Sequence, residues 1–283
     1  TLWGDNYLLW DDMLKKFNLS TLQRVHEKQR IAFAYNFRGL GQAEKGNYRE
    51  AIEDYNVALQ INGNYSEALN NRANAYAMIG QHDLAFRDFS QIIKMNPKHA
   101  DAYYNRANLY LHRKNIDEAV KDFTQAINTD PGMADAFNNR GVAFRLQRQY
   151  GRALEDFNRA LSINRKFAEA YFNRGSVFYL QKQYIAAISN FTQAVQIKPR
   201  YADAYFNRGV SFAHLGQYDH AIEDFRHVLN IDGHYVPALQ NLGSLFRQMK
   251  RCEESSEQYV KILRMNPDDQ NARENLKEIE RIK

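Results

Sequence analysis

The chain has 283 residues, of which 44% are hydrophobic and 25% charged, and no apolar run approaches the ~18 residues that a membrane-spanning helix needs. The net charge of +5 is interpreted as an excess spread along the chain, which does not favour a nucleic-acid surface. The single cysteine, Cys252, excludes an internal disulfide framework and fits a reducing compartment, so we expect a cytoplasmic protein, with the nucleus as the alternative.

Residues 1–31 come first and have no internal symmetry. The chain opens on Thr1 without an initiator Met or a signal region, so we expect a piece of a longer protein. A stripe of apolar residues indicates a helix: Leu9, Trp10, Met13, Leu14 and Phe17. Because Ser20 or Thr21 could cap a following helix, the segment is predicted to be an N-terminal helical cap or the docked end of a missing region.

A repeat follows. The phrase AYYNRA at Ala102 returns as AFNNRG at Ala136 and as AYFNRG at Ala170 and Ala204, always after 34 residues. This step tiles residues 32–269 into seven repeats: 32–65, 66–99, 100–133, 134–167, 168–201, 202–235 and 236–269. We number the places of each repeat from its first residue, so that place 8 of the third repeat is Ala107.

Each repeat predicts two packed helices. Large residues at place 4 and, from the second repeat on, at place 11 flank a small residue at place 8, and their spacing puts all three on one helical face. A small residue at place 20, four residues before an aromatic residue at place 24, forms the inner stripe of a second helix. Turn-like pairs such as Gly46-Asn47 and Gly80-Gln81 separate the two helices. Residues 270–283 carry apolar residues on one side only and are predicted to be a C-terminal capping helix.

With small residues at places 8 and 20, aromatics at 11 and 24, and proline at 32, the chain resembles the tetratricopeptide repeat (TPR) family. The resemblance covers 238 of 283 residues. It implies an all-α, right-handed superhelical solenoid of antiparallel helix pairs, with a concave groove lined mainly by the first helices.

Asparagine recurs at place 6, although it is a mediocre helix former. The members are Asn71, Asn105, Asn139, Asn173, Asn207 and Asn241, whereas the first repeat has Phe37. In the family, place 6 faces the groove, and the row resembles the asparagine ladder of the superhelix of O-linked N-acetylglucosamine transferase. A primary amide can both donate to and accept from a peptide backbone, so the row could hold an extended segment. The alternative is that the amides bridge neighbouring first helices.

Arginine at place 7 of the first six repeats could be taken for a phosphate-binding stripe. However, place 23 is aspartate in most repeats, and the seventh repeat loses both residues together, to Leu242 and Gln258. We therefore expect a structural pairing between the two helices. In the fifth repeat, Arg174 with Asn190 is a partial match.

Two further sets are candidates for the groove. Acidic residues stand at place 2, where the helix dipole alone could explain them: Asp101, Asp135, Glu169 and Asp203. If they face a ligand, its segment would be basic or neutral. Large residues in the middle repeats could be anchoring sites or could pack on the second helices: Phe172, Phe206 and Tyr179.

The sequence carries no phosphate loop, no zinc-protease motif and no tight histidine spacing, so no cofactor, metal or catalytic site is expected. Place 5 contains no lysine, which argues against a clamp for heat-shock C-terminal tails. We expect a protein–protein interaction scaffold or adaptor that binds an extended protein segment, without nucleic-acid or membrane partners. The alternatives are the substrate-recruiting arm of a larger glycosyltransferase-like enzyme, and a structural protein that self-associates.

Overall fold

A computed structural model describes residues 25–282 of the chain. These residues form fifteen helices and no strand. The first helices of successive repeats are α2 (Val25–Glu44), α4 (Ser66–Met78), α6 (Ala100–His112), α8 (Ala134–Leu146), α10 (Ala168–Leu180), α12 (Ala202–His214) and α14 (Val236–Gln248). The second helices are α3 (Tyr48–Ile61), α5 (His82–Met95), α7 (Ile116–Thr129), α9 (Tyr150–Ile163), α11 (Tyr184–Ile197), α13 (Tyr218–Ile231) and α15 (Cys252–Met265), and α16 (Gln270–Ile282) follows them. From α4 to α14 the first helices begin 34 residues apart, and the predicted all-α array of helix pairs is confirmed.

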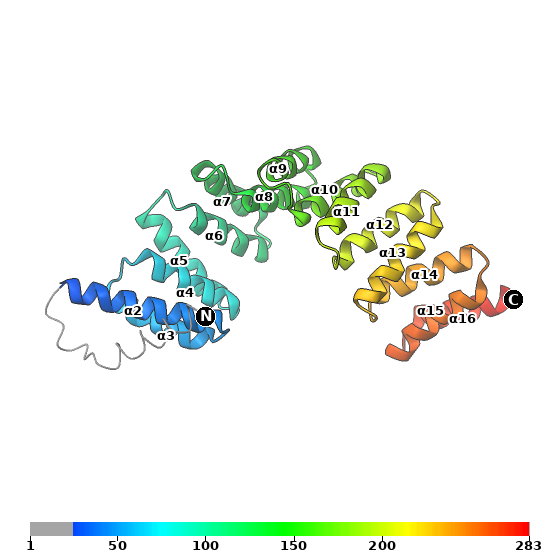
Figure 1. Ribbon diagram of the computed structural model, residues 1–283, viewed down its shortest axis with the longest axis horizontal. Coiled ribbons are helices and arrows are strands. Elements are labelled where there is room, and N and C mark those ends of the chain that lie inside the picture. Colours follow the sequence, from blue (N-terminus) through cyan, green and yellow to red (C-terminus); the bar gives the residue numbers. More distant parts are fainter. Residues whose placement is uncertain (1–24, 283) are drawn as a thin grey trace. The chain divides into compact units, whose positions relative to one another are not determined.

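The helices form two compact units, and each is described by itself. The N-terminal unit ends at Ala143 and the C-terminal unit begins at Phe144. Within each unit, helices that follow one another along the chain pack together, as in α2 with α3 or α10 with α11 (Figure 1). None of the helices of residues 25–282 is both long enough and apolar enough to cross a lipid bilayer.

The helix pairs are held by the small residue at place 8 against the aromatic ring at place 24. Phe123 is fully buried against Ala107 and Ala119 in the N-terminal unit. In the C-terminal unit, a Cβ on Gly175 would lie 2.9 Å from Cε1 of Phe191, so the helices approach too closely there for an alanine without adjustment. Burying each such ring contributes about 1.5–3 kcal/mol. This repeated contact is why the sequence folds into hairpins.

The turn between the two helices of each hairpin contains a residue with left-handed backbone at place 15. Glycine occupies this place at Gly46, Gly80 and Gly216, which have φ between 71° and 82°. The turns predicted at Gly46 and Gly80 are therefore confirmed. Four other repeats have a basic residue at the same place, with φ of 59° or 60°: Lys114, Arg148, Lys182 and Lys250. An L-residue costs about 1–2 kcal/mol in this conformation, so these turns are held by the packing of the helices around them.

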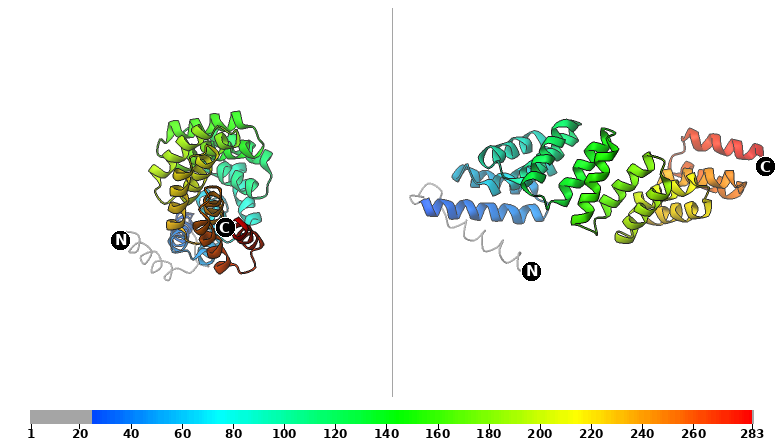
Figure 2. Two further views of the ribbon diagram at one scale, coloured as in Figure 1. Left: turned by 90° about the vertical axis from the view of Figure 1, so that its right-hand side faces the viewer. Right: turned by 90° about the horizontal axis from the view of Figure 1, so that it is seen from above.

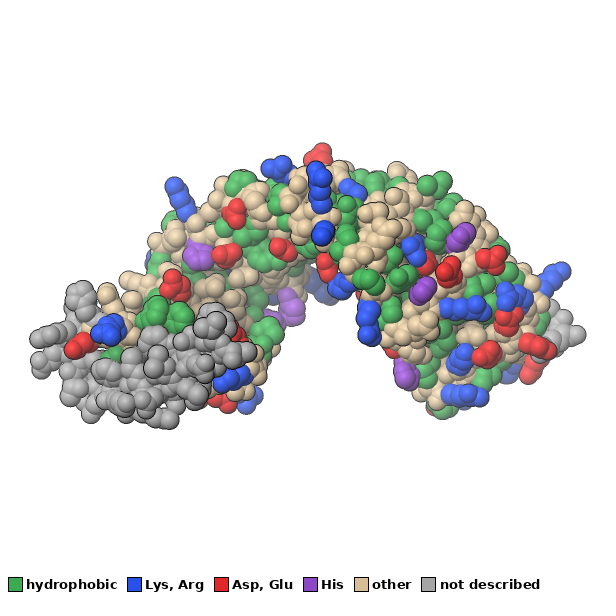
Figure 3. All heavy atoms as spheres, in the orientation of Figure 1, with side chains coloured by type: hydrophobic (Ala, Val, Ile, Leu, Met, Phe, Trp, Pro, Cys, Tyr) green, Lys and Arg blue, Asp and Glu red, His purple; other side chains and the backbone are tan. Residues whose placement is uncertain are grey.

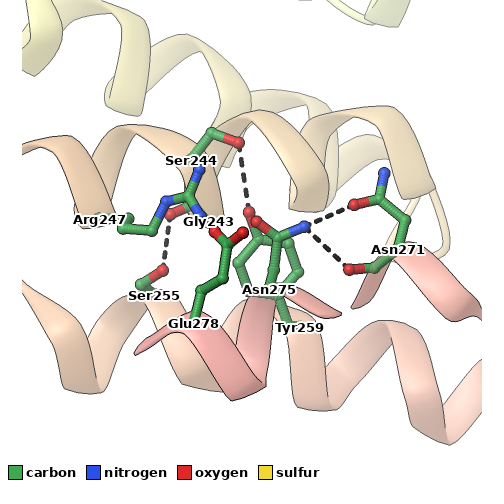
Figure 4. Close-up of polar contacts among 8 residues, drawn as sticks. All are labelled: Gly243, Ser244, Arg247, Ser255, Tyr259, Asn271, Asn275 and Glu278. Carbon is green, nitrogen blue, oxygen red and sulfur yellow. Dashed lines mark hydrogen bonds and ion pairs between the residues drawn. The ribbon is translucent and has the colours of Figure 1, made fainter. Parts of the chain in front are cut away.

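The helix α16 packs on the last repeat in the C-terminal unit (Figure 2). Its Ala272 and Ile279 are buried with Tyr259, and Arg247 of α14 forms an ion pair with Glu278. Beneath this contact, Ser255 Oγ donates to the carbonyl of Gly243 at 2.7 Å (Figure 4). Solvent-exposed residues on the other side of α16 make it suitable as an end cap.

At the other end, α2 begins at Val25 and runs through the predicted boundary at residue 32. Ile31 and Ala32 are buried on either side of this boundary, which explains why the helix continues across it. The apolar stripe predicted between Leu9 and Phe17 lies outside the described residues.

Candidate functional site

The place-7 arginines pair with place-23 aspartates, as the sequence predicted. Arg106 of α6 donates to both carboxylate oxygens of Asp122 on α7, at 2.7 and 2.9 Å. The same two-point contact joins three further pairs: Arg38 with Asp54, Arg72 with Asp88, and Arg208 with Asp224. Burial by itself would lower the pKa of Arg106, but the hydrogen bond and charge of Asp122 raise it. The guanidinium groups are thus part of the packing of each hairpin.

The same arginines also contact the preceding repeat, which sequence reasoning missed. Nη1 of Arg72 donates to Oδ1 of Asn56 at 2.7 Å, and Nη1 of Arg106 donates to Oγ of Ser90 at 3.1 Å. In each case the acceptor is at place 25 of the second helix before it. The available signal was the polar residue at this place in the first five repeats: Asn56, Ser90, Thr124, Asn158 and Thr192.

The pairing is weaker or absent in two repeats of the C-terminal unit. Arg174 donates through Nε to Oδ1 of the neutral Asn190 at 2.7 Å, and burial lowers the pKa of this arginine. The partial match predicted for the fifth repeat is confirmed. In the seventh repeat Leu242 is buried, and Gln258 donates instead to the carbonyl of Glu254 in its own helix.

The place-6 asparagines of the N-terminal unit bond to the preceding repeat. Asn71 donates to Oδ1 of Asn36 at 3.0 Å, and Asn139 donates to Oδ1 of Asn108 at 2.9 Å. Asn139 also donates to the hydroxyl of Tyr104 at 3.1 Å. A longer contact of 3.4 Å joins Asn105 to Asn74. These amides therefore connect neighbouring first helices, as the alternative interpretation of the row expects.

The acceptors in these contacts were not among the predicted site residues. Asn74 and Asn108 both stand at place 9, so a second amide repeats three residues after the first in two consecutive repeats. At place 5, Asn70 has an Oδ1 atom that is buried and meets no hydrogen-bond donor among the described residues. We call the surface formed by places 5, 6 and 9 of the first helices the first-helix face. In the N-terminal unit this face is rich in amides that bond mainly to one another.

The place-6 asparagines of the C-terminal unit behave differently. Asn207 donates to the carbonyl of Asp203 at 2.7 Å, and Asn241 donates to the carbonyl of Pro237 at 2.8 Å. Both acceptors lie one helical turn earlier in the same helix. Place 9 of the preceding repeats is Ser176 and Val210, so no amide is available there. Within the described residues, the Oδ1 atoms of Asn207 and Asn241 accept no hydrogen bond. This does not apply to Asn173, which does interact with other residues.

The two phenylalanines at place 5 lie between aromatic neighbours in the C-terminal unit. The ring centroid of Phe172 is 5.8 Å from that of Phe191 and 5.1 Å from that of Tyr201. Phe206 repeats this arrangement with Phe225 and Tyr235, at 5.7 and 5.4 Å. Both phenylalanines remain partly exposed. They pack on the second helices and still offer part of each ring to the first-helix face.

Tyr179 lies at the end of α10, in a cluster with Tyr184 and His214. Its hydroxyl is 3.2 Å from Nε2 of His214, whose ring stacks on Tyr184 with centroids 4.6 Å apart. Burial raises the pKa of Tyr179, and the neighbouring Tyr184 adds to this effect. The residue is therefore part of the contact between the fifth and sixth repeats.

The place-2 carboxylates all lie in the first turns of first helices, where the helix dipole stabilises them. Asp101 and Asp135 are exposed in the N-terminal unit. Glu169 is 3.0 Å from Nζ of Lys198, and Asp203 accepts a hydrogen bond of 3.1 Å from the hydroxyl of Tyr235. The two place-2 carboxylates of the C-terminal unit, Glu169 and Asp203, are therefore already paired with other side chains.

No group of three or more His, Cys, Asp or Glu side chains within residues 25–282 is arranged to hold a metal ion. The two histidines of α5 and α6, His82 and His112, have ring centroids 4.3 Å apart and no carboxylate or thiol joins them to complete a ligand set.

Comparison with protein families matches most of the chain to tetratricopeptide repeats. Models of the tetratricopeptide repeat match residues 66–99, 100–133, 134–167, 202–235 and 236–269, and a model of TPR repeats matches 42–80 and 175–216. A comparison with curated protein sequences finds no match.

Several solved structures have the same fold. The APC/C hetero-tetramer Cut9–Hcn1 matches with a TM-score of 0.67 and 17% identity over 98% of this chain and 52% of that chain. A tetratricopeptide repeat protein from Parabacteroides merdae matches with a TM-score of 0.65 and 18% identity, over 88% and 99%. YrrB, described as a TPR protein with an unusual peptide-binding site, matches with a TM-score of 0.54 and 24% identity, over 66% and 97%. At these identities the likeness shows the fold alone.

Proposed function

Because the chain belongs to the tetratricopeptide repeat family, we propose that it is a non-enzymatic interaction protein whose first-helix face binds an extended segment of another protein. A stack of hairpins presents such a face repeatedly at a fixed spacing, which suits a linear ligand. The structural similarity to YrrB, which is described as a TPR protein with an unusual peptide-binding site, supports the same class of function.

The observation that carries the proposal is the state of the asparagines in the C-terminal unit. Asn207 and Asn241 use one amide hydrogen on their own helix and keep Oδ1 for an acceptor role. An extended peptide has a backbone N–H at every second residue on one side, and each can donate to such an oxygen. The partly exposed rings of Phe172 and Phe206 lie one residue before Asn173 and Asn207, so an apolar side chain of the ligand would have an anchor beside the amides.

The N-terminal unit contributes differently to this proposal. Its asparagines are bonded to one another, so we assign them a structural role and not the main contacts with the ligand. Its exposed acidic residues, Asp101 and Asp135, favour a ligand whose corresponding part is neutral or basic.

A display library of random 16-residue peptides, selected on the full chain, tests the proposal. The selected peptides should lose affinity by about tenfold or more for the double variant Asn207→Ala, Asn241→Ala, because each lost hydrogen bond contributes about 0.5–1.5 kcal/mol. N-methylation of alternate peptide nitrogens should weaken binding in the same way, since it removes the backbone donors.

The matched control is the double variant Asn71→Ala, Asn105→Ala in the N-terminal unit. It removes the same chemical groups, and we expect peptide binding to stay within about twofold of the unmodified chain. If both double variants bind the selected peptides as well as the unmodified chain does, the first-helix asparagines do not hold the ligand and the proposal is wrong.

A further inference from the structure

The positive charge of the chain is concentrated in one stretch, contrary to the even spread expected from the sequence. Residues 145–200 contain ten Lys or Arg and three Asp or Glu, a net charge of +7. The remaining residues contain 28 basic and 30 acidic residues, a net charge of −2. This stretch lies wholly in the C-terminal unit. Further along the same unit, around α13 and α15, basic and acidic side chains are intermixed (Figure 3).

Some of these basic residues lie at the turns between paired helices, next to exposed apolar residues. We call this surface the turn edge and define it by six residues: Arg145, Leu146, Arg148, Leu180, Lys182 and Ile185. All six residues lie in the C-terminal unit, around the turn between α8 and α9 and around the turn between α10 and α11. The helix that follows the first turn, α9, packs against α10, which leads into the second turn.

The turn backbone does not explain why Arg148 and Lys182 are basic. Both have left-handed φ angles, of 59° and 60°, in which glycine alone is unstrained. Gly216 occupies the equivalent place in the next hairpin, with φ of 71°. Lys114 and Lys250 share this conformation, so what distinguishes Arg148 and Lys182 is the exposed apolar side chains beside them in the turn edge.

Arg145 has a buried hydrogen-bond donor without an acceptor. Its Nε atom is inaccessible to solvent and meets no hydrogen-bond partner among the described residues. No carboxylate stands beside it to compensate: burial lowers its pKa, and Tyr150 is the only neighbour that opposes this effect. The charge of Arg145 therefore has no carboxylate partner within the described residues, which favours an anionic group of a ligand beside its guanidinium.

The apolar part of the turn edge is exposed to an unusual degree. The exposed fractions of Leu146, Leu180 and Ile185 are 54%, 48% and 76%. Large aliphatic side chains next to cations, at the tips of two hairpins, form a surface with both kinds of contact. On a surface that contacts only water, these exposed aliphatic side chains would have no binding role.

We propose that the turn edge is a docking surface for an acidic, amphipathic segment of another protein, in which carboxylates alternate with apolar side chains. The carboxylates pair with the guanidinium groups of Arg145 and Arg148 and with the ammonium group of Lys182. The apolar side chains of the ligand cover Leu180 and Ile185. The turn edge consists of the ends of α8 and α10 and the turns and helix that follow them, and it shares no residue with the asparagines and phenylalanines of the proposed function. The inference therefore goes beyond that function.

Two other classes of partner fit the observations less well. A nucleic acid would pair with the cations, but it would gain little from the exposed aliphatic side chains. An anionic membrane would interact with both the cations and the aliphatic side chains. However, the turn edge has three cations and no Trp, Tyr or Phe among its defining residues, and such aromatic residues are typical of membrane-surface sites. The segment of alternating acidic and apolar residues matches both features.

The test uses a fluorescent synthetic peptide of four Glu-Glu-Leu-Phe repeats, measured by anisotropy at low and at physiological salt with the full chain. The key variant is Arg148→Gly, Lys182→Gly, which removes both charges and relieves the left-handed backbone. We expect its peptide affinity to fall at least tenfold while its melting temperature stays the same or rises. The Arg145→Gln variant should lower affinity as well.

Three controls keep the outcome specific. Lys250→Gly makes the same substitution at the same place in the seventh repeat and should leave peptide affinity unchanged. Asn207→Ala with Asn241→Ala should also leave it unchanged, which separates this site from the first-helix face. A peptide with Gln in place of Glu should bind at least tenfold more weakly.

The proposal is overturned if the acidic peptide binds Arg148→Gly, Lys182→Gly as tightly as it binds the unmodified chain. It is also overturned if the peptide does not bind the unmodified chain, whether or not phosphatidylserine vesicles or a single-stranded oligonucleotide do. Binding of either of these two probes, lost in the same variant, would then identify a phosphate-bearing partner in its place.

Discussion

The same asparagine at place 6 makes different contacts in the two units. In the N-terminal unit, Asn71 and Asn139 reach amides on the preceding first helix. In the C-terminal unit, Asn207 and Asn241 turn back to a carbonyl of their own helix. The residue is identical, and the difference lies in what the preceding repeat offers at places 5 and 9.

This comparison separates two uses of one repeated position. Places 5 and 9 of the N-terminal unit include Asn36 and Asn108, which accept from the next repeat. The C-terminal unit has Phe172 and Val210 at these places, so Asn207 and Asn241 meet no amide at places 5 and 9 of the preceding repeat and bond to their own helix. The amides therefore bond between repeats where the amide row continues across places 5 and 9. Where aromatic or aliphatic residues interrupt the row, Asn207 and Asn241 bond only within their own helix.

The largest expected effect concerns the arginine pairs, which are complete in the three hairpins of the N-terminal unit. In the C-terminal unit the pair of Arg208 with Asp224 is complete, whereas the fifth and seventh repeats lack the aspartate. Asp122→Ala should lower the free energy of unfolding by about 3 kcal/mol, because it leaves Arg106 mostly buried without a carboxylate. Asn190→Ala in the C-terminal unit removes a single bond to Arg174 and should cost about 1 kcal/mol. Urea unfolding followed by circular dichroism measures both. Equal losses would show that the neutral pair is as important as the charged one.

The second effect concerns the close approach of the helices at place 8, where α4 and α6 have alanine and α10, α12 and α14 have glycine. A Cβ on Gly243 would lie 2.7 Å from Cζ of the buried Tyr259, so Gly243→Ala should destabilise the chain by about 1–2 kcal/mol. The nearest atom to a Cβ on Gly209 is at 3.0 Å, and the helix propensity of alanine offsets much of that strain. Thermal unfolding of Gly209→Ala should thus differ little from that of the unmodified chain.

The third effect tests the asparagine comparison directly. Asn139→Ala removes hydrogen bonds to Asn108 and Tyr104 and should cost about 1 kcal/mol. Asn207→Ala removes a local bond while introducing a better helix former, so its stability should change by less than about 0.5 kcal/mol. Urea midpoints of the two variants, measured side by side, decide the matter. A larger loss for Asn207→Ala would contradict the division of roles between the units.

The smallest effect is a pH dependence that the two units should share. Burial, with the neighbouring Asp203, raises the pKa of Tyr235 to about 12, and burial with Glu67 raises that of Tyr65 to about 12. The folded state holds these protons more tightly than the unfolded chain, in which tyrosine titrates near 10. Their contribution to stability is therefore present below pH ~10 and is lost as pH rises through ~12.

Tyr235→Phe and Tyr65→Phe check this expectation. Each variant should show a shallower decline of the urea midpoint between about pH 9 and 12 than the unmodified chain does. Asp203→Asn should reduce the decline in the C-terminal unit alone. A decline unchanged by both phenylalanine substitutions would assign the alkaline sensitivity to other groups.

Much of the fold and one of its polar contacts could be predicted from the sequence. The 34-residue step and the small residues at places 8 and 20 require paired helices, because only such residues allow the observed approach of Gly175 to Phe191. The arginine–aspartate pairing was predictable because Leu242 and Gln258 replace both partners in one repeat. Once the hairpin is fixed, places 7 and 23 have only one way to meet.

The candidate site was less predictable, for a physical reason. An asparagine side chain can bond to its own helix, to the next helix or to a ligand, and these choices differ by about 1 kcal/mol or less. The residue that determines which partner the asparagine takes, such as Asn108 or Val210, belongs to the preceding repeat. The concentration of charge in residues 145–200 was readable from the sequence, whereas the buried Nε of Arg145 required the structure.

The fixed period of the contacts also bears on how the chain reaches its folded state. Side-chain hydrogen bonds between helices of one hairpin, or of neighbouring hairpins, join residues 12 to 35 positions apart, as in Ser255 with Gly243 and Asn71 with Asn36. Contacts this local require little loop closure, so we expect rapid folding from any of several starting hairpins. During synthesis, each hairpin can form once it has left the ribosome, and it can then pack on the hairpin that precedes it in the chain.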